Sequence, residues 1–182
     1  MSAPLGVILA GGLATRMGGG DKGLLKLDDR PILQHVIDRL KPQVAGLALN
    51  ANGDADRFDD FGLPVIADSI AEYPGPLAGV LAGLDWAHAQ GAEAIVTAAA
   101  DTPFFPDNLV ATLQEAATAS SLALAASRDE SGKLWRQPTF GLWPVALRDD
   151  LRVALQDGLR KVVMWTDQHG AGQAVFEADG FD

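Results

Sequence analysis

The sequence predicts an α/β fold, a three-layer domain in which helices cover both faces of a mostly parallel sheet. Short apolar runs alternate along the chain with stretches of helical periodicity, an order typical of strands joined by crossover helices. The runs at Leu5–Leu9 and Ala94–Ala99 are continuous, as expected for strands that are buried on both faces. At 182 residues, the chain is long enough for one such domain.

Local signals predict the individual elements in chain order. The run Leu5–Leu9 is ended by Gly11 and Gly12 and predicts the first strand. Residues 31–40 place aliphatic side chains on one helical face and a proline in the first turn, which predicts a helix. The same signals predict further strands at 44–50, 63–67, 94–99, 122–126 and 138–143, and further helices at 77–89, 106–117 and 145–156.

Composition excludes several classes of protein. The formal net charge of −10 and the pI near 4.6 argue against a nucleic-acid or membrane-surface binder, although a local positive pocket could still bind a small anion. The absence of cysteine excludes disulfides and thiolate chemistry. The N-terminal residues lack the pattern of a secretory signal, and no apolar run has the length of a membrane span, so we expect a cytoplasmic location.

Polar residues follow several of the predicted strands. A glycine-rich stretch follows the first strand, and Asn50, Asp68 and Asp101 each follow a later one. In open parallel α/β sheets, ligands bind beyond the carboxyl ends of the strands. We therefore expect these residues to gather at one edge of the sheet, although they are far apart in the sequence.

The glycine-rich stretch also carries Arg16, Lys22 and Lys26, which suits a loop that wraps N–H groups and cations around phosphates. An ordinary surface loop is the alternative. Its G-x-G-x-x-G spacing begins at Gly18, nine positions after Leu9, whereas the dinucleotide-binding fingerprint directly follows its strand. The stretch does not contain the G-x-x-x-x-G-K-[ST] of a P-loop either.

Over this stretch, the pattern L-A-G-G-x-x-x-R-M-G-x-x-D-K resembles the signature loop of the nucleotidyltransferases with a Rossmann-like fold. Its identities are Leu9, Ala10, Gly11, Gly12, Arg16, Met17, Gly18, Asp21 and Lys22. Further stretches narrow the resemblance to the molybdenum cofactor guanylyltransferases. They are D-K-G-L-L-K-L at 21–27, L-N-A-N at 49–52, V-I-A-D-S at 65–69, Y-P-G-P-L-A-G at 73–79 and D-T-P-F at 101–104.

The second part of the chain resembles this family at fewer positions. R-Q-P-T at 136–139 resembles an R-x-H-P-T element with glutamine in place of histidine, and G-L-R-K-V at 158–162 resembles a basic helical turn. The family usually ends with an asparagine-rich N-V-N-T-P element and a helix. We expect this chain to lack that C-terminal tail.

The resemblance implies a single nucleotidyltransferase domain over residues 1–182, with a GTP-binding half at 1–110 and a pterin-binding half at 111–182. It implies Mg²⁺-dependent transfer of GMP from GTP to the phosphate of molybdopterin, with or without bound molybdenum, and release of pyrophosphate. The main tasks of such a protein are to neutralise the triphosphate and to align the two reactants. Implied protein partners are molybdopterin carriers or molybdoenzyme chaperones.

The resemblance also assigns roles to individual residues. Lys22 and Arg16 bind the triphosphate and are catalytic together with Asp101, which is the expected Mg²⁺ ligand. The expected GTP contacts are Leu9, Ala10, Gly11, Gly12, Lys22, Asn50, Asp68 and Asp101. The expected contacts to the pterin phosphate are Arg136, Arg160 and Lys161.

Plainer roles are open for several of these residues. Asp101 could cap a helix or close a turn, and Asn50 could be a turn residue at a strand end. The three basic residues of the second half could form a solvated, salt-bridged helix face. The histidines are scattered without metal-ligand spacing and are expected to be structural or on the surface; they are His35, His88 and His169.

Three other functions are alternatives. Cytidylyl transfer to the same pterin is the nearest, although L-A-G-G followed by D-K-G-L resembles the GTP-using branch more closely than the L-A-A-G of the cytidylyl branch. Nucleotidyl transfer to a sugar phosphate or polyol phosphate is the second. A module that binds GTP without turnover is the third, and the absent C-terminal tail favours it because the pterin half of the site would then be incomplete.

Overall fold

The computed structural model describes residues 3–10, 24–70, 76–117, 119–159, 161–177 and 181. The strands are β1 Leu5–Leu9, β2 Lys26–Leu27, β3 Arg30–Pro31, β4 Leu47–Asn50, β5 Val65–Ile66, β6 Ala94–Ala99, β7 Ala123–Arg128, β8 Leu134–Pro144 and β9 Gly172–Phe176. The helices are α1 Ile32–Leu40, α2 Leu77–Ala89, α3 Leu109–Ala116, α4 Arg148–Gln156 and α5 Val162–Gln168. Short 3₁₀ helices lie at η3 Lys41–Gln43, η4 Ala55–Phe61 and η5 Val145–Leu147.

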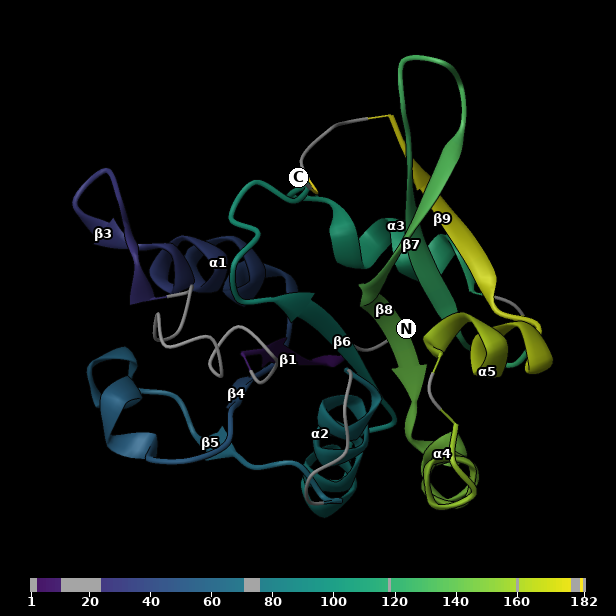
Figure 1. The fold of residues 1–182 in the computed structure, drawn as a ribbon, viewed down its shortest axis with the longest axis horizontal. Coiled ribbons are helices and arrows are strands. Elements are labelled where there is room, and N and C mark those ends of the chain that lie inside the picture. The colour runs from purple at the N-terminus through teal and green to yellow at the C-terminus, as the bar shows by residue number, and fades with distance from the viewer. Residues whose placement is uncertain are drawn as a thin grey trace.

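Within these described ranges, seven strands form one sheet in the order β5-β4-β1-β6-β8-β7-β9. Strand β1 pairs in parallel with β4 and β6, β4 with β5, and β7 with β9. Strand β8 runs antiparallel to both of its neighbours. The predicted α/β fold with a mostly parallel sheet is therefore confirmed, and Figure 1 shows α1 and α3 on one side and α2 and α4 on the other.

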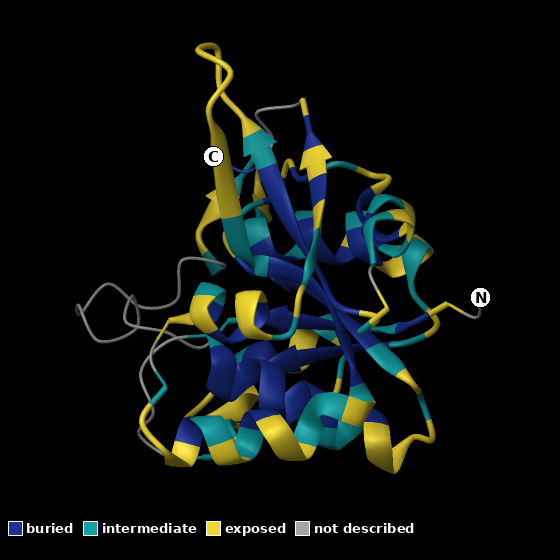
Figure 2. Ribbon diagram, turned by 90° about the vertical axis from the view of Figure 1, so that its right-hand side faces the viewer, coloured by how far each residue is buried: buried dark blue, intermediate teal, exposed yellow. Residues whose placement is uncertain are grey.

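Each face of the sheet has its own hydrophobic core. On one face, Ile8 of β1 packs in a cluster with Leu33 of α1 and Leu109 of α3. On the other face, Val7 and Leu9 pack in a cluster with residues of α2, α4 and α5. Successive residues of a strand point to opposite faces, so β1 requires apolar side chains in both directions. Figure 2 shows the resulting buried layers along the strands and the facing sides of the helices.

Elements with strong local signals have the predicted bounds, and others differ at their ends. The predictions for β1, α2 and β6 are confirmed residue for residue. Helix α1 begins one residue later than predicted because Pro31 has a ψ of 140°, outside the helical region. The strand expected at 44–50 begins only at Leu47, and residues 44–46 connect it to the 3₁₀ turn η3.

Local signals do not predict α5, β9 or the β2–β3 hairpin. Helix α5 is only seven residues long and packs through Trp165, whose ring stacks on Trp143 of β8 at 6.3 Å between centroids. Strand β9 is paired along its whole length with β7. Helix α5 and strand β9 therefore depend on partners that are distant in the sequence. None of the helices in the described part of the chain has the length and apolar character needed to cross a membrane.

A buried hydroxyl helps to join the parallel and antiparallel parts of the sheet. Thr97 of β6 is fully buried, and its Oγ1 donates to the carbonyl oxygen of Thr139 at 2.9 Å. The same oxygen accepts from Nε1 of Trp143 at 2.9 Å and from the amide of Gly141 at 3.3 Å. Thr97 thus satisfies two donors of β8 that have no access to water.

We expect Thr97→Val to lower the free energy of unfolding by ~1–3 kcal/mol, because it leaves buried donors without an acceptor. Urea denaturation measures this change. The matched control is Thr112→Val on α3, where the hydroxyl donates only to the carbonyl oxygen of Asn108; its expected effect is below about 0.5 kcal/mol. Equal effects for the two variants would contradict the role of Thr97.

Candidate active site

The carboxyl end of β1 lies between the ends of β4 and β6. The amide of Ala10 donates to the carbonyl oxygen of Asn50 at 2.8 Å, and the amide of Ala100 donates to the carbonyl oxygen of Leu9 at 3.1 Å. These bonds fix the two residues that precede the glycine-rich stretch. The predicted contacts at Gly11, Gly12, Arg16, Lys22 and Arg160 lie outside the described residues.

Asn50 and Asp68 meet at this edge of the sheet, as the sequence predicts. Asn50 is 2% exposed, and its Nδ2 donates to Oδ1 of Asp68 at 3.0 Å and to the carbonyl oxygen of Ile66 at 3.1 Å. Asn52 completes the arrangement: its Nδ2 donates to Oδ2 of Asp68 at 3.0 Å, and its Oδ1 accepts from the Asp68 amide at 2.9 Å. Two side-chain amides therefore orient the Asp68 carboxylate.

Sequence reasoning assigned no role to Asn52. The available signal was its place in L-N-A-N, two residues after Asn50. Strand β4 ends at Asn50, so Asn52 lies in the chain just beyond it. From there its side chain reaches the same carboxylate as Asn50.

A glycine allows the buried amide to pack against helix α2. A Cβ atom on Gly79 would lie 3.0 Å from Cγ of Asn50 and 3.0 Å from Cδ2 of Leu9, and closer still to Oδ1 of Asn50. Real Cβ atoms do not tolerate such contacts. The first turn of α2 can therefore approach β4 and β1 only with glycine at this position.

Asp101 lies at the same edge of the sheet but is not in the Asn50–Asp68 cluster. It follows β6, and two strand spacings separate β6 from β4, about 10 Å. Its side chain is exposed, and its Oδ1 accepts from the Thr102 hydroxyl at 3.4 Å. Helix α3 begins only at Leu109, so Asp101 is not its cap. In the described part of the chain, no three His, Asp or Glu side chains are grouped to hold a metal ion.

Of the basic residues predicted for the pterin phosphate, the two that the structure describes, Arg136 and Lys161, lie apart. Arg136 of β8 forms an ion pair with Asp167 of α5 at 2.9 Å. Lys161 is exposed at the other end of α5, about 9 Å away along the helix. Beside Arg136 lies a polar groove of about 730 Å³. Its lining includes Ser127, Arg128, Trp135, Gln137 and Glu177.

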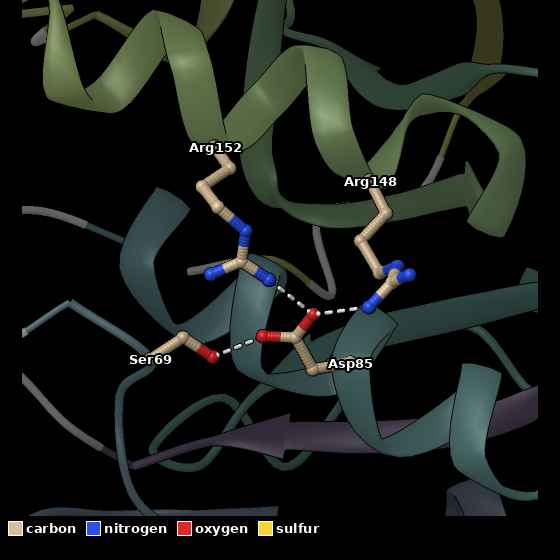
Figure 3. A network of polar contacts seen from close by, with 4 residues as sticks. All are labelled: Ser69, Asp85, Arg148 and Arg152. Carbon is tan, nitrogen blue, oxygen red and sulfur yellow. Dashed lines mark hydrogen bonds and ion pairs between the residues drawn. The ribbon is translucent and has the colours of Figure 1, made fainter.

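Asp85 of α2 forms the centre of a second polar network (Figure 3). Its Oδ1 accepts from Arg148 at 3.0 Å and from Arg152 at 2.5 Å, and its Oδ2 accepts from the hydroxyl of Ser69 at 2.5 Å. Partial burial alone would raise the pKa of Asp85, but the hydrogen bonds from Ser69, Arg152 and Arg148 outweigh it and lower the pKa below its ordinary value. Asp85 is therefore a stable carboxylate at neutral pH.

Solved structures define the class of fold. The chain matches molybdopterin-guanine dinucleotide biosynthesis protein A from Archaeoglobus fulgidus with a TM-score of 0.66 and 18% identity, over 95% of this chain and 83% of the other. It matches a 4-diphosphocytidyl-2C-methyl-D-erythritol synthase from Anaerococcus prevotii with a TM-score of 0.73 and 12% identity. This match covers 100% of this chain and 91% of the other. Both proteins share the α/β fold described above.

Sequence comparison identifies the family. The model of the MobA-like NTP transferase domain matches residues 6–171. The molybdenum cofactor guanylyltransferase of Nitrobacter hamburgensis is 51% identical over 166 residues, which cover 88% of this chain and 77% of the relative. The molybdenum cofactor guanylyltransferase of Rhodopseudomonas palustris strain BisB5 is 50% identical over 181 residues, which cover 97% of this chain and 84% of the relative. The chain therefore belongs to the MobA-like NTP transferase family.

The packing of Asn50 against α2 can be tested by a double-mutant cycle. We expect Gly79→Ala to cost ~1–3 kcal/mol of unfolding free energy, and about 1 kcal/mol less when Asn50 is also replaced by alanine, because the clash with Asn50 is then removed and only the contact with Leu9 stays. Urea denaturation of the four proteins gives both values.

Gly83→Ala on the same helix is the matched control. Its Cβ would meet Ile95 at 2.8 Å and Val7 at 2.9 Å, and neither contact involves Asn50. This substitution should therefore be additive with Asn50→Ala. If Gly79→Ala is additive with Asn50→Ala as well, the amide does not pack against this glycine.

Proposed function

We propose that the protein transfers GMP from GTP to the phosphate of molybdopterin, with release of pyrophosphate and formation of molybdopterin guanine dinucleotide. The observation that carries the proposal is the 50–51% identity, over 88–97% of the chain, to proteins named molybdenum cofactor guanylyltransferase. The Asn50–Asp68 cluster at the carboxyl edge of the sheet supports it, since this is where ligands of parallel α/β sheets bind.

Asp68 and Asn50 contribute differently to the guanosine part of GTP. The Asp68 carboxylate is held by amides and is only partly buried, so it can accept hydrogen bonds from the nucleotide. Asn50 donates both of its amide hydrogens within the protein. Its Oδ1 packs against Gly79 and its side chain is 2% exposed, so Asn50 supports nucleotide binding by orienting Asp68.

The triphosphate is assigned to the glycine-rich stretch. Lys22 and Arg16 supply positive charge, and the backbone of residues 9–12 approaches the phosphates. Because the amide of Ala10 already donates to Asn50, the N–H groups that meet phosphate belong to the residues after it, Gly11 and Gly12 among them. These assignments rest on the resemblance of the loop.

Asp101 is the proposed Mg²⁺ ligand. Mg²⁺ prefers one or two carboxylates together with phosphate oxygens and water, so a single exposed carboxylate beside the phosphates fits its needs. When bound, the ion would neutralise charge on the triphosphate. The Thr102 hydroxyl lies 3.4 Å from Oδ1 of the same carboxylate.

The chemical step requires alignment more than proton transfer. An oxygen of the molybdopterin phosphate attacks the α-phosphorus of GTP in line, and the bond to the bridging oxygen breaks as pyrophosphate leaves. The attacking phosphate oxygen is already ionised at neutral pH, so no general base and no covalent enzyme intermediate are required. The protein acts by charge neutralisation and by positioning.

Arg136, Arg160 and Lys161 are the proposed contacts to the molybdopterin phosphate in the half at 111–182. Arg136 would have to exchange Asp167 for the substrate. Its side chain is 35% exposed and that of Asp167 is 59% exposed. Exposed pairs of this kind contribute only about 0–1 kcal/mol, so a phosphate dianion can displace the carboxylate. This function also leads us to propose a cytoplasmic location and contacts with molybdopterin carriers or molybdoenzyme chaperones.

The direct test incubates the protein with Mg²⁺, molybdopterin and either GTP or CTP, and measures pyrophosphate and the mass of the pterin product. We expect turnover with GTP and none with CTP. Turnover with CTP alone would instead establish cytidylyl transfer. GTP binding without a product would mean a nucleotide-binding module.

We expect Asp101→Asn to lower kcat with GTP by at least about 100-fold while the fold is retained, because the amide cannot neutralise the metal-bound phosphates. Steady-state pyrophosphate release and thermal unfolding are measured together. Asp107→Asn, at an exposed carboxylate in the same loop, is the matched control and should keep wild-type kinetics. Wild-type kinetics for both variants would remove Asp101 from the site.

A further inference from the structure

The Asp85 network links the two halves of the chain at the segment that carries Asp68. Arg148 and Arg152 come from α4, 63 and 67 residues after Asp85, and Ser69 lies 16 residues before it. Ser69 directly follows Asp68 in the sequence. The segment Asp68–Ser69 is therefore held on one side by Asn50 and Asn52. On the other side it is held by Asp85 of α2, which is itself bound to the two arginines of α4.

We infer that Asp85 is a positioning residue for nucleotide binding, which acts through Ser69 to hold Asp68 in the orientation that receives GTP. This inference rests on the proposed function. The side-chain amides of Asn50 and Asn52 set the direction of the Asp68 carboxylate, and Asn52 also accepts from the Asp68 amide, while the bond from Ser69 holds the next residue of the same backbone from the side of α2. The Ser69 bond adds a restraint from the opposite side of the segment, and this restraint reaches the carboxylate because a side chain moves with its backbone.

The geometry of the Asp85 carboxylate supports this positioning role. The two arginines stand one turn apart on α4 and both donate to Oδ1, which orients the carboxylate so that Oδ2 faces Ser69 (Figure 3). Hydrogen bonds to an ionised acceptor are stronger than neutral ones. The Asp85 side chain is 27% exposed, so solvent competes less than at a surface ion pair.

The chain offers a matched ion pair without such a link. Asp38 of α1 accepts from Arg30 and from Gln34, and its side chain is 50% exposed. None of these three residues belongs to the candidate site. Asp38→Asn therefore removes an arginine-paired carboxylate of the same type without touching the segment of Asp68.

The test measures GTP dissociation constants with Mg²⁺ by calorimetry, and kcat and KM for both substrates. We expect Asp85→Asn and Ser69→Ala each to weaken GTP binding and to raise the KM for GTP by about 3- to 10-fold, with the KM for molybdopterin unchanged. The double variant should be no weaker than Asp85→Asn alone, since both substitutions break the same link. Ser69→Thr keeps the hydroxyl and should stay within about twofold of wild type, and Asp38→Asn should match wild type.

A lower melting temperature in Asp85→Asn with unchanged GTP affinity in both variants would overturn the inference and leave a purely structural network. If the wild-type protein binds GTP but makes no dinucleotide, the proposed function fails, whereas the dissociation constants still decide the role of Asp85. If the wild-type protein binds no GTP, both proposals are overturned.

Discussion

The burial of strand β1 on both faces is the constraint on which the rest of the structure depends. Its side chains enter two separate cores, and its backbone is hydrogen-bonded to β4 on one side and to β6 on the other. A shift of β1 by one residue would move each of its side chains into the opposite core and break the hydrogen-bonded registers with β4 and β6. The carboxyl ends of β4, β1 and β6 are therefore fixed relative to one another. Among the described residues, the candidate nucleotide contacts lie at or just beyond strand ends at this edge; they are Leu9, Ala10, Asn50, Asp68 and Asp101.

Electrostatics restricts where an anionic substrate can bind to this acidic chain. The net charge is −10, and no lysine or arginine lies between Phe58 and Ser127. Several described arginines already face carboxylates; these pairs are Arg30–Asp38, Arg128–Glu177, Arg136–Asp167, Arg148–Asp85 and Arg152–Asp85. A triphosphate would therefore depend on local cations and on a divalent ion, rather than on the field of the whole protein.

The fold was predictable where one local signal dominated. The continuous apolar runs of β1 and β6 and the apolar, turn-bounded helix α2 have the bounds that their periodicity indicates. Helix α5 and strand β9 escaped prediction because each is short and is stabilised by distant partners, the ring of Trp143 and the edge of β7. Strand β8 extends four residues further toward the N-terminus than predicted, since residues 134–137 pair with β7 beyond the irregularity at Leu124 and Ala125.

By itself, the sequence determined the class of fold, the family and the identity of the residues expected at the carboxyl edge, because these depend on local periodicity and on short motifs at fixed spacing. Only the tertiary structure showed that Asn52 shares the Asp68 carboxylate with Asn50, that Gly79 makes room for the Asn50 amide, and that Asp85 connects α4 to Ser69. Such contacts join residues that lie up to 67 positions apart. They arise from the packing of whole elements against one another, which no local pattern records.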